Sequence, residues 1–350
     1  MADTSYGVND ALAVKVWGKK LFVDALKQTH ADRFMGKGSD SLIQVKSDLA
    51  KGPGDQITVG LRMQLSGDGV QGDSTLEGNE ESLTTYSDAI VVNQLRHAVR
   101  SAGKMSEQRV PFSVRDEARA GLSDWYAARI DQAFFNQICG YTLQSDTKYT
   151  GNNAVTGPDA DHRVWATGTD DTSQTSTDIF TLTLIDKAVE KAATLSPTVR
   201  PLRIGGEDKY VCFLHPYQVY DLRTNTSTGQ WLDIQKAALM GGNESKNPIY
   251  TGALGEYNGV ILHSNTRVTV GITNAGVTKT DVRRAVLCGA QAATFAYGGD
   301  GGQEMQWVEE LFDYKNKLGV AAKMIWGMKK NIFNSDDFST IVMSSYAAAH

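Results

Sequence analysis

The sequence predicts an α+β protein, because strands and helices are mixed along its 350 residues without a regular βαβ repeat. Three stretches carry this prediction. Residues 111–140 have the apolar spacing of one long helix. Residues 57–65 alternate between apolar and polar side chains, as a half-buried strand does. Residues 305–329 contain two further alternating runs around a polar turn, which predicts a C-terminal β-hairpin.

The first part of the chain has weaker signals. Residues 1–10 are polar, and we expect them to form a mobile arm. Residues 11–29 carry apolar side chains at helical spacing and predict a helix, which Gly18 weakens. Residues 41–46 predict a short strand.

The clearest strand in the sequence opens a long hairpin. Ile57, Val59 and Leu61 alternate with polar residues, and strand signals return over residues 83–92. The intervening residues Ser66–Ser82 contain no lysine or arginine, and a loop of this length usually marks function or disorder. This segment holds the carboxylates Asp68, Asp73, Glu77, Glu80 and Glu81. The sequence therefore predicts a long hairpin with a wide, acidic, flexible tip.

The long helix has a well-marked start and end. Pro111 cannot continue a helix backwards, Ser113 is a good N-cap, and Gly140 suits the left-handed position that ends a helix. We expect residues 113–139 to form a rod about 38 Å long, at roughly 1.5 Å per residue. The predicted buried stripe is Val114, Ala118, Leu122, Trp125, Ile130, Phe134 and Ile138. The predicted solvated face is Arg115, Asp116, Glu117, Arg119, Asp124, Arg129 and Asp131. This pattern favours the spine of a large flat domain over an ordinary surface helix or an arm of a coiled coil.

The rest of the chain mixes short elements. Residues 142–177 are rich in Thr, Ser, Asp and Gly and predict a surface insertion. Asp178 predicts the N-cap of a helix over residues 179–195. Further helices are expected over 216–223 and 230–240, strands over 210–214, 259–264, 267–272 and 284–289, and hairpin strands over 305–313 and 319–329.

Composition excludes several functional classes. The chain has a net charge of −5 and no block of Lys or Arg, so it lacks the electrostatic footprint of a nucleic-acid-binding protein. Its three cysteines, Cys139, Cys212 and Cys288, share no metal-ligand spacing, and we expect them to fill core space. The sequence has no export-signal pattern and no apolar window of membrane-spanning length, so we expect no membrane partner.

Several motifs resemble catalytic or binding sites, but a structural explanation fits each of them better. Residues 67–72 match G-x-G-x-x-G, but no helical stripe follows and the nearby carboxylates would repel a pyrophosphate. No two histidines have helical ligand spacing among His30, His97, His162, His215, His263 and His350. Three pairs of adjacent acids are interpreted as solvated: Glu80 with Glu81, Asp170 with Asp171, and Asp336 with Asp337. We therefore expect no catalytic site, no cofactor and no metal ion.

Several stretches carry a resemblance to a known family: VNDALAVKVWGKKLFVDAL, SLIQVKSDLAKGPGDQITVGLRMQLSGDGVQGDSTLEGNEESL, LRHAVRSAGKMSEQRVPFSVRDEARAGLSDWYAARIDQAFFNQICG, YVCFLHPYQVYDLR and the C-terminal hairpin. They resemble the major capsid proteins of tailed bacteriophages, in the family typified by the short-tailed coliphage that packages its own RNA polymerase. The resemblance spans most of the chain, but residues 142–177 and 266–280 have no match.

The resemblance implies the HK97-like fold and divides the chain accordingly. Residues 1–50 would be the N-terminal arm, and residues 51–95 the extended loop. Residues 96–195 and 286–350 would form the peripheral domain with the spine helix, and residues 196–285 the axial domain.

The resemblance also implies a structural function rather than an enzymatic one. The chain would be a major capsid protein that self-assembles into the hexamers and pentamers of an icosahedral head. That head would enclose double-stranded DNA without binding it sequence-specifically. Decoration, scaffolding and portal proteins are further implied partners, and the protein would be assembled in the host cytoplasm and end in the virion. An encapsulin-like compartment shares the fold and is an alternative. A carboxylate-based hydrolase is another, which would need two acids in one cleft.

The loop composition predicts where neighbouring subunits meet. Carboxylates without a nearby cation repel one another, so in a shell the acidic tip would need a basic partner surface. We expect the tip to contact cations of an adjacent subunit. The candidates are Arg115 and Arg119 on the long helix and Lys315 and Lys317 in the C-terminal turn.

Overall fold

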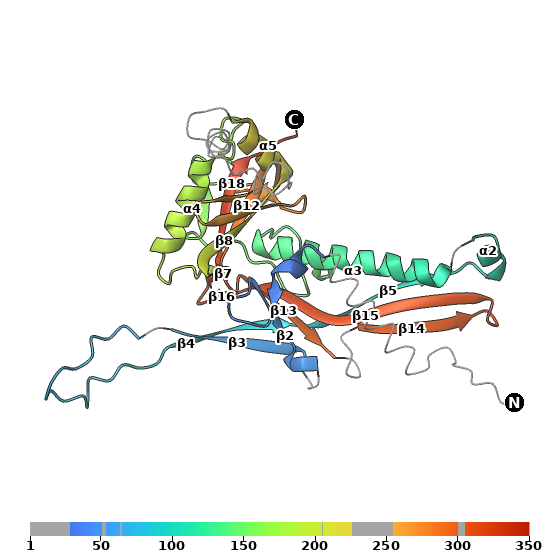
Figure 1. The fold of residues 1–350 in the computed structure, drawn as a ribbon, viewed down its shortest axis with the longest axis horizontal. Helices are drawn as coiled ribbons and strands as arrows, with labels where there is room; N and C mark the ends of the chain where they lie inside the picture. The colour runs from blue at the N-terminus through green and yellow to red at the C-terminus, as the bar shows by residue number, and fades with distance from the viewer. Residues whose placement is uncertain are drawn as a thin grey trace.

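The structure is a computed structural model that describes residues 29–50, 54–63, 65–111, 113–204, 206–225, 255–299 and 305–349. The molecule is elongated, and a long two-stranded hairpin projects from one end (Figure 1). Two larger β-sheets form the body, and the helix α3 (Val114–Ile138) lies along one of them. This mixture of helices and strands confirms the predicted α+β class.

The first sheet has six strands and is organised around one long central strand. Its members are β1 (Met35–Gly36), β2 (Ile43–Lys46), β5 (Asn93–Arg100), β13 (Ala293–Gly298), β14 (Met305–Phe312) and β15 (Lys317–Lys330). The strand β15 pairs antiparallel with β5, β13 and β14, and its pairing with β14 confirms the predicted C-terminal hairpin. Met324, Trp326 and Met328 alternate along β15 and are buried, because alternate side chains of a strand share one face.

The second sheet has eight strands. Its members are β6 (Arg163–Trp165), β7 (Leu202–Ile204), β8 (Glu207–Leu214), β9 (Glu256–Tyr257), β10 (Val260–Ser264), β11 (Val270–Ile272), β12 (Thr278–Cys288) and β18 (Thr340–Tyr346). Two helices accompany it, α4 (Leu182–Thr194) and α5 (Pro216–Thr224). On β12, Ala285 and Leu287 join the core under α4, whereas Val286 and Cys288 join the core under α3. This sheet is therefore buried on both faces.

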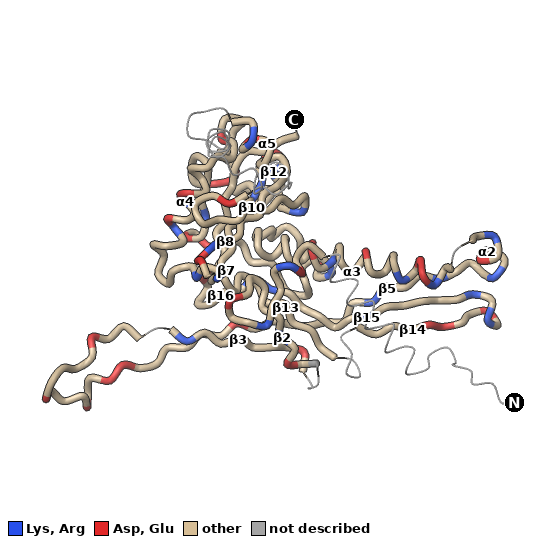
Figure 2. The backbone as a smooth tube through the Cα atoms, in the orientation of Figure 1, with Lys and Arg blue, Asp and Glu red and all other residues tan. Residues whose placement is uncertain are grey.

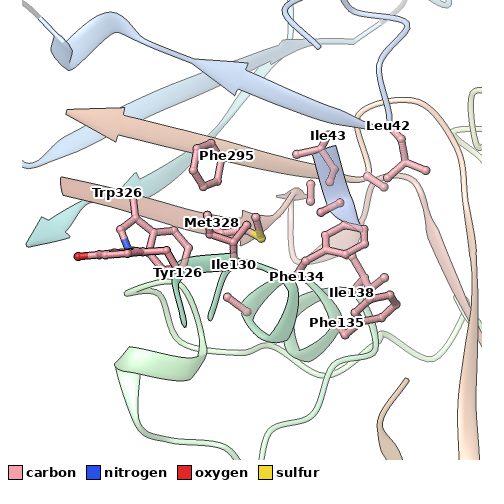
Figure 3. Packing of buried hydrophobic residues seen from close by; sticks show 14 of the residues in the cluster. Leu42, Ile43, Tyr126, Ile130, Phe134, Phe135, Ile138, Phe295, Trp326 and Met328 are labelled. Carbon is pink, nitrogen blue, oxygen red and sulfur yellow. The ribbon is translucent and has the colours of Figure 1, made fainter. Parts of the chain in front are cut away.

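The C-terminal half of α3 fastens the two sheets together. Phe134, Phe135 and Ile138 are fully buried, and Figure 3 places them beside side chains of the first sheet such as Ile43. The Phe213 ring of the second sheet packs edge-on against Phe134 at 5.7 Å and against Phe135 at 5.5 Å between centroids. The single apolar cluster around these rings makes α3 the structural spine that its length predicted.

The two ends of α3 lie where the sequence predicts them. The Ser113 hydroxyl accepts a hydrogen bond from the Asp116 N–H, as an N-cap does, at 3.4 Å. Gly140 has φ of 64°, the left-handed conformation that glycine adopts without a steric penalty. The predicted bounds 113–139 are thus confirmed to within a residue.

One prediction about the faces of α3 is wrong, and another holds only in part. Asp131, predicted on the solvated face, is buried, and its carboxylate accepts the N–H groups of His30 and Ala31, both at 3.0 Å. Trp125, predicted in the buried stripe, is half-buried and stacks on His97 at 4.5 Å. Tyr126 is fully buried instead, and its hydroxyl lies within hydrogen-bond distance of two carbonyl oxygens of the first sheet.

The projecting hairpin consists of β3 (Gln56–Arg62) and β4 (Thr85–Val91). Its base is anchored to the body, because Lys329 pairs with Asp88 and the Asn153 side chain hydrogen-bonds the Val91 backbone. Beyond the last pair, Arg62 with Thr85, the described residues have no strand structure. The predicted hairpin and irregular tip are confirmed, although β3 is shorter than the predicted strand 57–65.

The prediction that residues 142–177 form a surface insertion is wrong in part. Their short strand β6 pairs in parallel with β18, and the 3₁₀ helix η3 (Thr147–Tyr149) contacts α3. His162, Asp171 and Gln174 are buried. Their polar groups have partners inside the fold, which a composition-based reading of the segment could not reveal.

The helix predicted over residues 179–195 begins three residues later than expected. Thr181 occupies the N-cap of α4, and Asp178 instead accepts the N–H of Thr175 at 2.7 Å within the preceding turn. The predicted strands 41–46, 210–214, 259–264, 267–272 and 284–289 overlap β2, β8, β10, β11 and β12, and the predicted helix 216–223 overlaps α5. The predicted arm 1–10 and helix 230–240 lie outside the described residues, as does nearly all of the helix 11–29.

The remaining described elements are short: η1 (Ala31–Phe34), η2 (Asp48–Ala50), α2 (Lys104–Gln108), β16 (Ile332–Phe333) and β17 (Asp336–Asp337). In the part of the chain that the structure describes, no helix is both long and apolar enough to cross a membrane. Residues 96–195 and 286–350 contribute strands to both large sheets, since β6 and β18 belong to the second.

Candidate interaction surfaces

The first candidate surface is the tip of the projecting hairpin, which we call the acidic loop (residues 66–82). All its carboxylate residues are exposed, and they cluster at one extreme of the molecule in Figure 2. The loop contains no lysine or arginine. Three exposed leucines lie in or beside it: Leu65 is 57% exposed, Leu76 60% and Leu83 58%. The acidic loop thus presents both negative charge and apolar surface to solvent.

Two of the loop carboxylates have a structural role within the loop. Glu81 accepts the backbone N–H of Ser66 at 2.9 Å and that of Gly67 at 2.7 Å, so it closes the neck of the loop. These hydrogen bonds stabilise the charged form and lower the pKa of Glu81. Glu80 accepts the N–H of Gly78 at 2.7 Å. The other carboxylates, Asp68, Asp73 and Glu77, have no hydrogen bond or ion pair to a described residue.

The second candidate surface lies at the opposite extreme of the molecule, and we call it the distal end. It consists of α2 and the turn of residues 313–316 between β14 and β15 (Figures 1 and 2). Lys315 of this turn is exposed, and Lys317 just beyond it pairs with Asp313 at 3.6 Å. On α3, Arg115 pairs with Glu309 at 2.6 Å, and Arg119 is half-buried.

The structure does not bring the predicted acids and cations together within one subunit. The acidic loop and the distal end are separated by the whole length of the molecule (Figure 2). Any contact between them must therefore join two copies of the chain. Of the predicted cations, Arg115 and Lys317 already have carboxylate partners in their own subunit, whereas Lys315 has no ion pair to a described residue.

Sequence reasoning missed two exposed cations of the distal end. Lys104 begins α2 and Arg109 follows its end, and both are exposed. The signal was present, because residues 96–109 carry four Arg or Lys residues and only one acid, Glu107. No helix was predicted over these residues, so their cations were not assigned to a candidate surface.

A histidine cluster joins the described N-terminal residues to the second sheet. The His30 ring contacts Phe213 at 6.0 Å and His263 at 6.0 Å between centroids. Burial lowers the pKa of both imidazoles. The charges facing them are Arg33 and the buried Asp131, whose own pKa is raised by burial. The cluster therefore holds these residues together through ring contacts.

Two buried acids in the body have ion-pair partners. Asp171 lies 2.7 Å from Arg284, and Asp337 lies 2.6 Å from Lys330, with both pairs buried. The prediction that these two acids are solvated is therefore wrong. Burial lowers the pKa of Lys330 and raises that of Asp337. Among the described residues, no group of three or more His, Cys, Asp or Glu side chains is arranged to hold a metal ion.

Comparison with known proteins identifies the family to which the chain belongs. A sequence model of the phage capsid protein family matches residues 5–349, which is nearly the whole chain. The chain belongs to the phage capsid protein family. It is a structural protein of the phage shell, and the resemblance drawn from its sequence is confirmed.

Individual capsid proteins match this chain along nearly their full length. The major capsid protein of Pseudomonas phage KPP25 is 30% identical over 370 residues, covering 95% of this chain and 94% of that protein. The capsid of Ralstonia phage GP4 is 31% identical, with a TM-score of 0.77, covering 99% of this chain and 96% of that one. The capsid of cyanophage Pam1 is 20% identical with a TM-score of 0.74, covering 93% and 94%, and it supports the fold alone. The predicted HK97-like capsid fold is confirmed.

Proposed function

We propose that this capsid protein self-assembles into the hexamers and pentamers of an icosahedral head that encloses double-stranded DNA. The observation that carries the proposal is the hairpin that projects beyond the body of the subunit (Figure 1). A two-stranded hairpin with an irregular tip is marginally stable in water, so it needs a neighbour to pack against. The net negative charge of the chain suits a shell that encloses DNA without adhering to it.

We propose the following roles for the parts of the subunit. Residues 1–50 act as the N-terminal arm, and residues 51–95 as the extended loop that reaches over a neighbour. The sheet around β15, with α3, serves as the peripheral domain. The second sheet serves as the axial domain around the capsomer centre. On this division α4, β6 and β18 join the axial domain beside residues 196–285, because they share its sheet and core.

The contact between neighbours joins the acidic loop of one copy to the distal end of the next. Support comes from their opposite charges and their positions at opposite extremes of the subunit (Figure 2). Each exposed ion pair contributes only about 0–1 kcal/mol. A shell repeats the contact in every subunit, so assembly responds to a small change. Since the Debye length falls to about 3 Å at 1 M salt, high salt weakens the contact.

Charge reversal tests this contact. Asp73→Lys together with Glu77→Lys should impair assembly at low salt, and Lys315→Glu in the same chain should restore it. We choose these acids over Glu81 because the Glu81 side chain closes the loop by itself. Asp161→Lys, at an exposed site on the body, is the matched control. Normal assembly of the double reversal at low salt would show that the loop is merely solvated.

The contents of the purified particle separate the remaining functions. Packaged DNA supports a virus head, whereas a cargo enzyme would support an encapsulin-like compartment. We infer that the chain has no enzymatic activity, which a hydrolase assay on purified particles tests. Decoration, scaffolding and portal proteins are proposed partners, to be sought by mass spectrometry of particles assembled in the host cytoplasm.

A further inference from the structure

The turn between β14 and β15 has an unusual backbone. Asp313, Tyr314 and Lys315 have φ of 54°, 52° and 72°, so three consecutive non-glycine residues are left-handed. This conformation brings Cβ close to the following carbonyl oxygen, and tyrosine is disfavoured in it. Hairpin turns of this kind ordinarily carry glycine, asparagine or aspartate. A tyrosine at this position therefore costs stability in the isolated subunit.

Backbone and side-chain contacts hold the turn in this conformation. The Asn316 N–H donates to the Asp313 carbonyl at 2.9 Å, and the Asp313 carboxylate pairs with Lys317 at 3.6 Å. The Asn316 side-chain oxygen accepts the N–H of Lys104 at 3.3 Å, which ties the turn to the start of α2. The turn is thus a fixed part of the distal end.

The fixed turn presents an aromatic ring to solvent. Tyr314 is fully exposed, with a relative accessibility of 104%. Around it at the distal end are Met105, which is 69% exposed, and Phe312, which is 36% exposed. Exposed aromatic and methionine side chains mark interface centres, where tyrosine is among the residues that contribute most to binding. At this exposure the Tyr314 ring contributes little burial to the fold of its own subunit.

We propose that Tyr314 is the apolar anchor of the contact with a second copy of this chain, where it packs against the exposed leucines of the acidic loop. This inference rests on the proposed self-assembly. Two independent properties of the surfaces match: the exposed Leu65, Leu76 and Leu83 lie in or beside the acidic loop, and the charge of the loop is opposite to that of Lys104 and Lys315 beside the anchor.

The geometry requires that the partner be another molecule. The distal end and the acidic loop lie at opposite extremes of one subunit, so the anchor does not reach its own loop (Figure 1). A contact between two different surfaces of identical chains is heterologous, and it forms rings or extended lattices. The charges steer the encounter and set its salt dependence, whereas the tyrosine sets the lifetime of the contact.

Substitutions at position 314 distinguish an effect on assembly from an effect on the folding of the subunit. Tyr314→Asn removes the ring and suits the left-handed backbone, so it should leave the subunit folded and at least as heat-stable. We expect it to raise the concentration needed for assembly about tenfold, at both 0.1 M and 1 M salt, as loss of one interface anchor does. Tyr314→Phe keeps the ring and should assemble like the wild type. Tyr220→Ala, at a half-exposed tyrosine on α5, is the control.

Cysteine cross-linking identifies the surface that the anchor meets. All three native cysteines are buried, so Thr75→Cys and Lys315→Cys each add an exposed thiol beside Leu76 and Tyr314 while leaving both side chains in place. A disulfide between copies should form in mixtures of the two single variants, and not between Lys315→Cys and Asp161→Cys. Normal assembly of Tyr314→Asn would overturn the anchor. If Tyr314→Asn impairs assembly but no disulfide joins positions 75 and 315, Tyr314 contacts another surface and the proposed loop contact is wrong. Absence of wild-type particles would instead contradict the proposed self-assembly.

Discussion

Replacing Phe134 with alanine tests whether α3 is the spine of the subunit. Phe134 is fully buried, and its ring packs edge-on against Phe135 at 5.2 Å and Phe213 at 5.7 Å between centroids. Truncation removes apolar burial, leaves a cavity and loses both aromatic contacts. Substitutions of this kind cost about 3–5 kcal/mol. The upper half of that range applies here because the ring packs in a core that both sheets share. The two sheets cannot both move to fill the cavity that the substitution leaves.

Differential scanning calorimetry of assembled particles measures the effect. A loss of 1 kcal/mol lowers the unfolding midpoint by about 2–4 °C in chains of 150–250 residues, and by less in a longer chain. We therefore expect Phe134→Ala to lower the midpoint by on the order of 5 °C or to prevent regular particles. Asp124→Ala, on the exposed face of the same helix, should change neither. Regular Phe134→Ala particles with the midpoint of the control would refute the assignment of α3 as a buried spine.

Three further predictions concern the body and the hairpin. Burial lowers the folded pKa of His30 and His263 below the unfolded value near 6.5, so the stability contributed by the uncharged rings is full above that pH and is lost as the pH falls below it. The variant His263→Phe should flatten this dependence in thermal unfolding. Asp171→Ala should destabilise the subunit by about 3–5 kcal/mol because Arg284 is left buried and unpaired. Replacing both with apolar residues should restore only part of the loss in urea titrations, because the Asp171 carboxylate also accepts the N–H of Ile272. Residues 65–84 of the unassembled subunit should exchange amide hydrogens rapidly and become protected in particles; early protection in the monomer would contradict their dependence on a neighbour.

The elements that the sequence predicted well are those whose signals are local. The helix over residues 113–139 was predictable because a cap, an apolar stripe and a terminal glycine occur together. The hairpin strands were predictable because their alternating apolar side chains are more buried than the side chains between them. Thr181 replaced Asp178 as the cap of α4 because both residues are good caps and the preceding turn uses the Asp178 carboxylate.

What the sequence could not predict depends on contacts between distant residues. Asp131 lies on the charged face of α3 by spacing, yet it is buried because backbone N–H groups a hundred residues earlier need an acceptor. Asp171 and Asp337 appeared solvated because their cation partners were not identifiable from local composition. The charge of the acidic loop was visible from its residues, but the use of Glu81 to close the loop depends on its fold.

Size-exclusion chromatography with light scattering, applied to the purified wild-type chain, tests self-assembly most directly. The account predicts particles in the megadalton range, far above the 38.0 kDa of one subunit. It also predicts that lowering the salt from 1 M to 0.1 M shifts material from free subunits into those particles. A single small closed oligomer, unchanged by concentration and salt, would contradict the account.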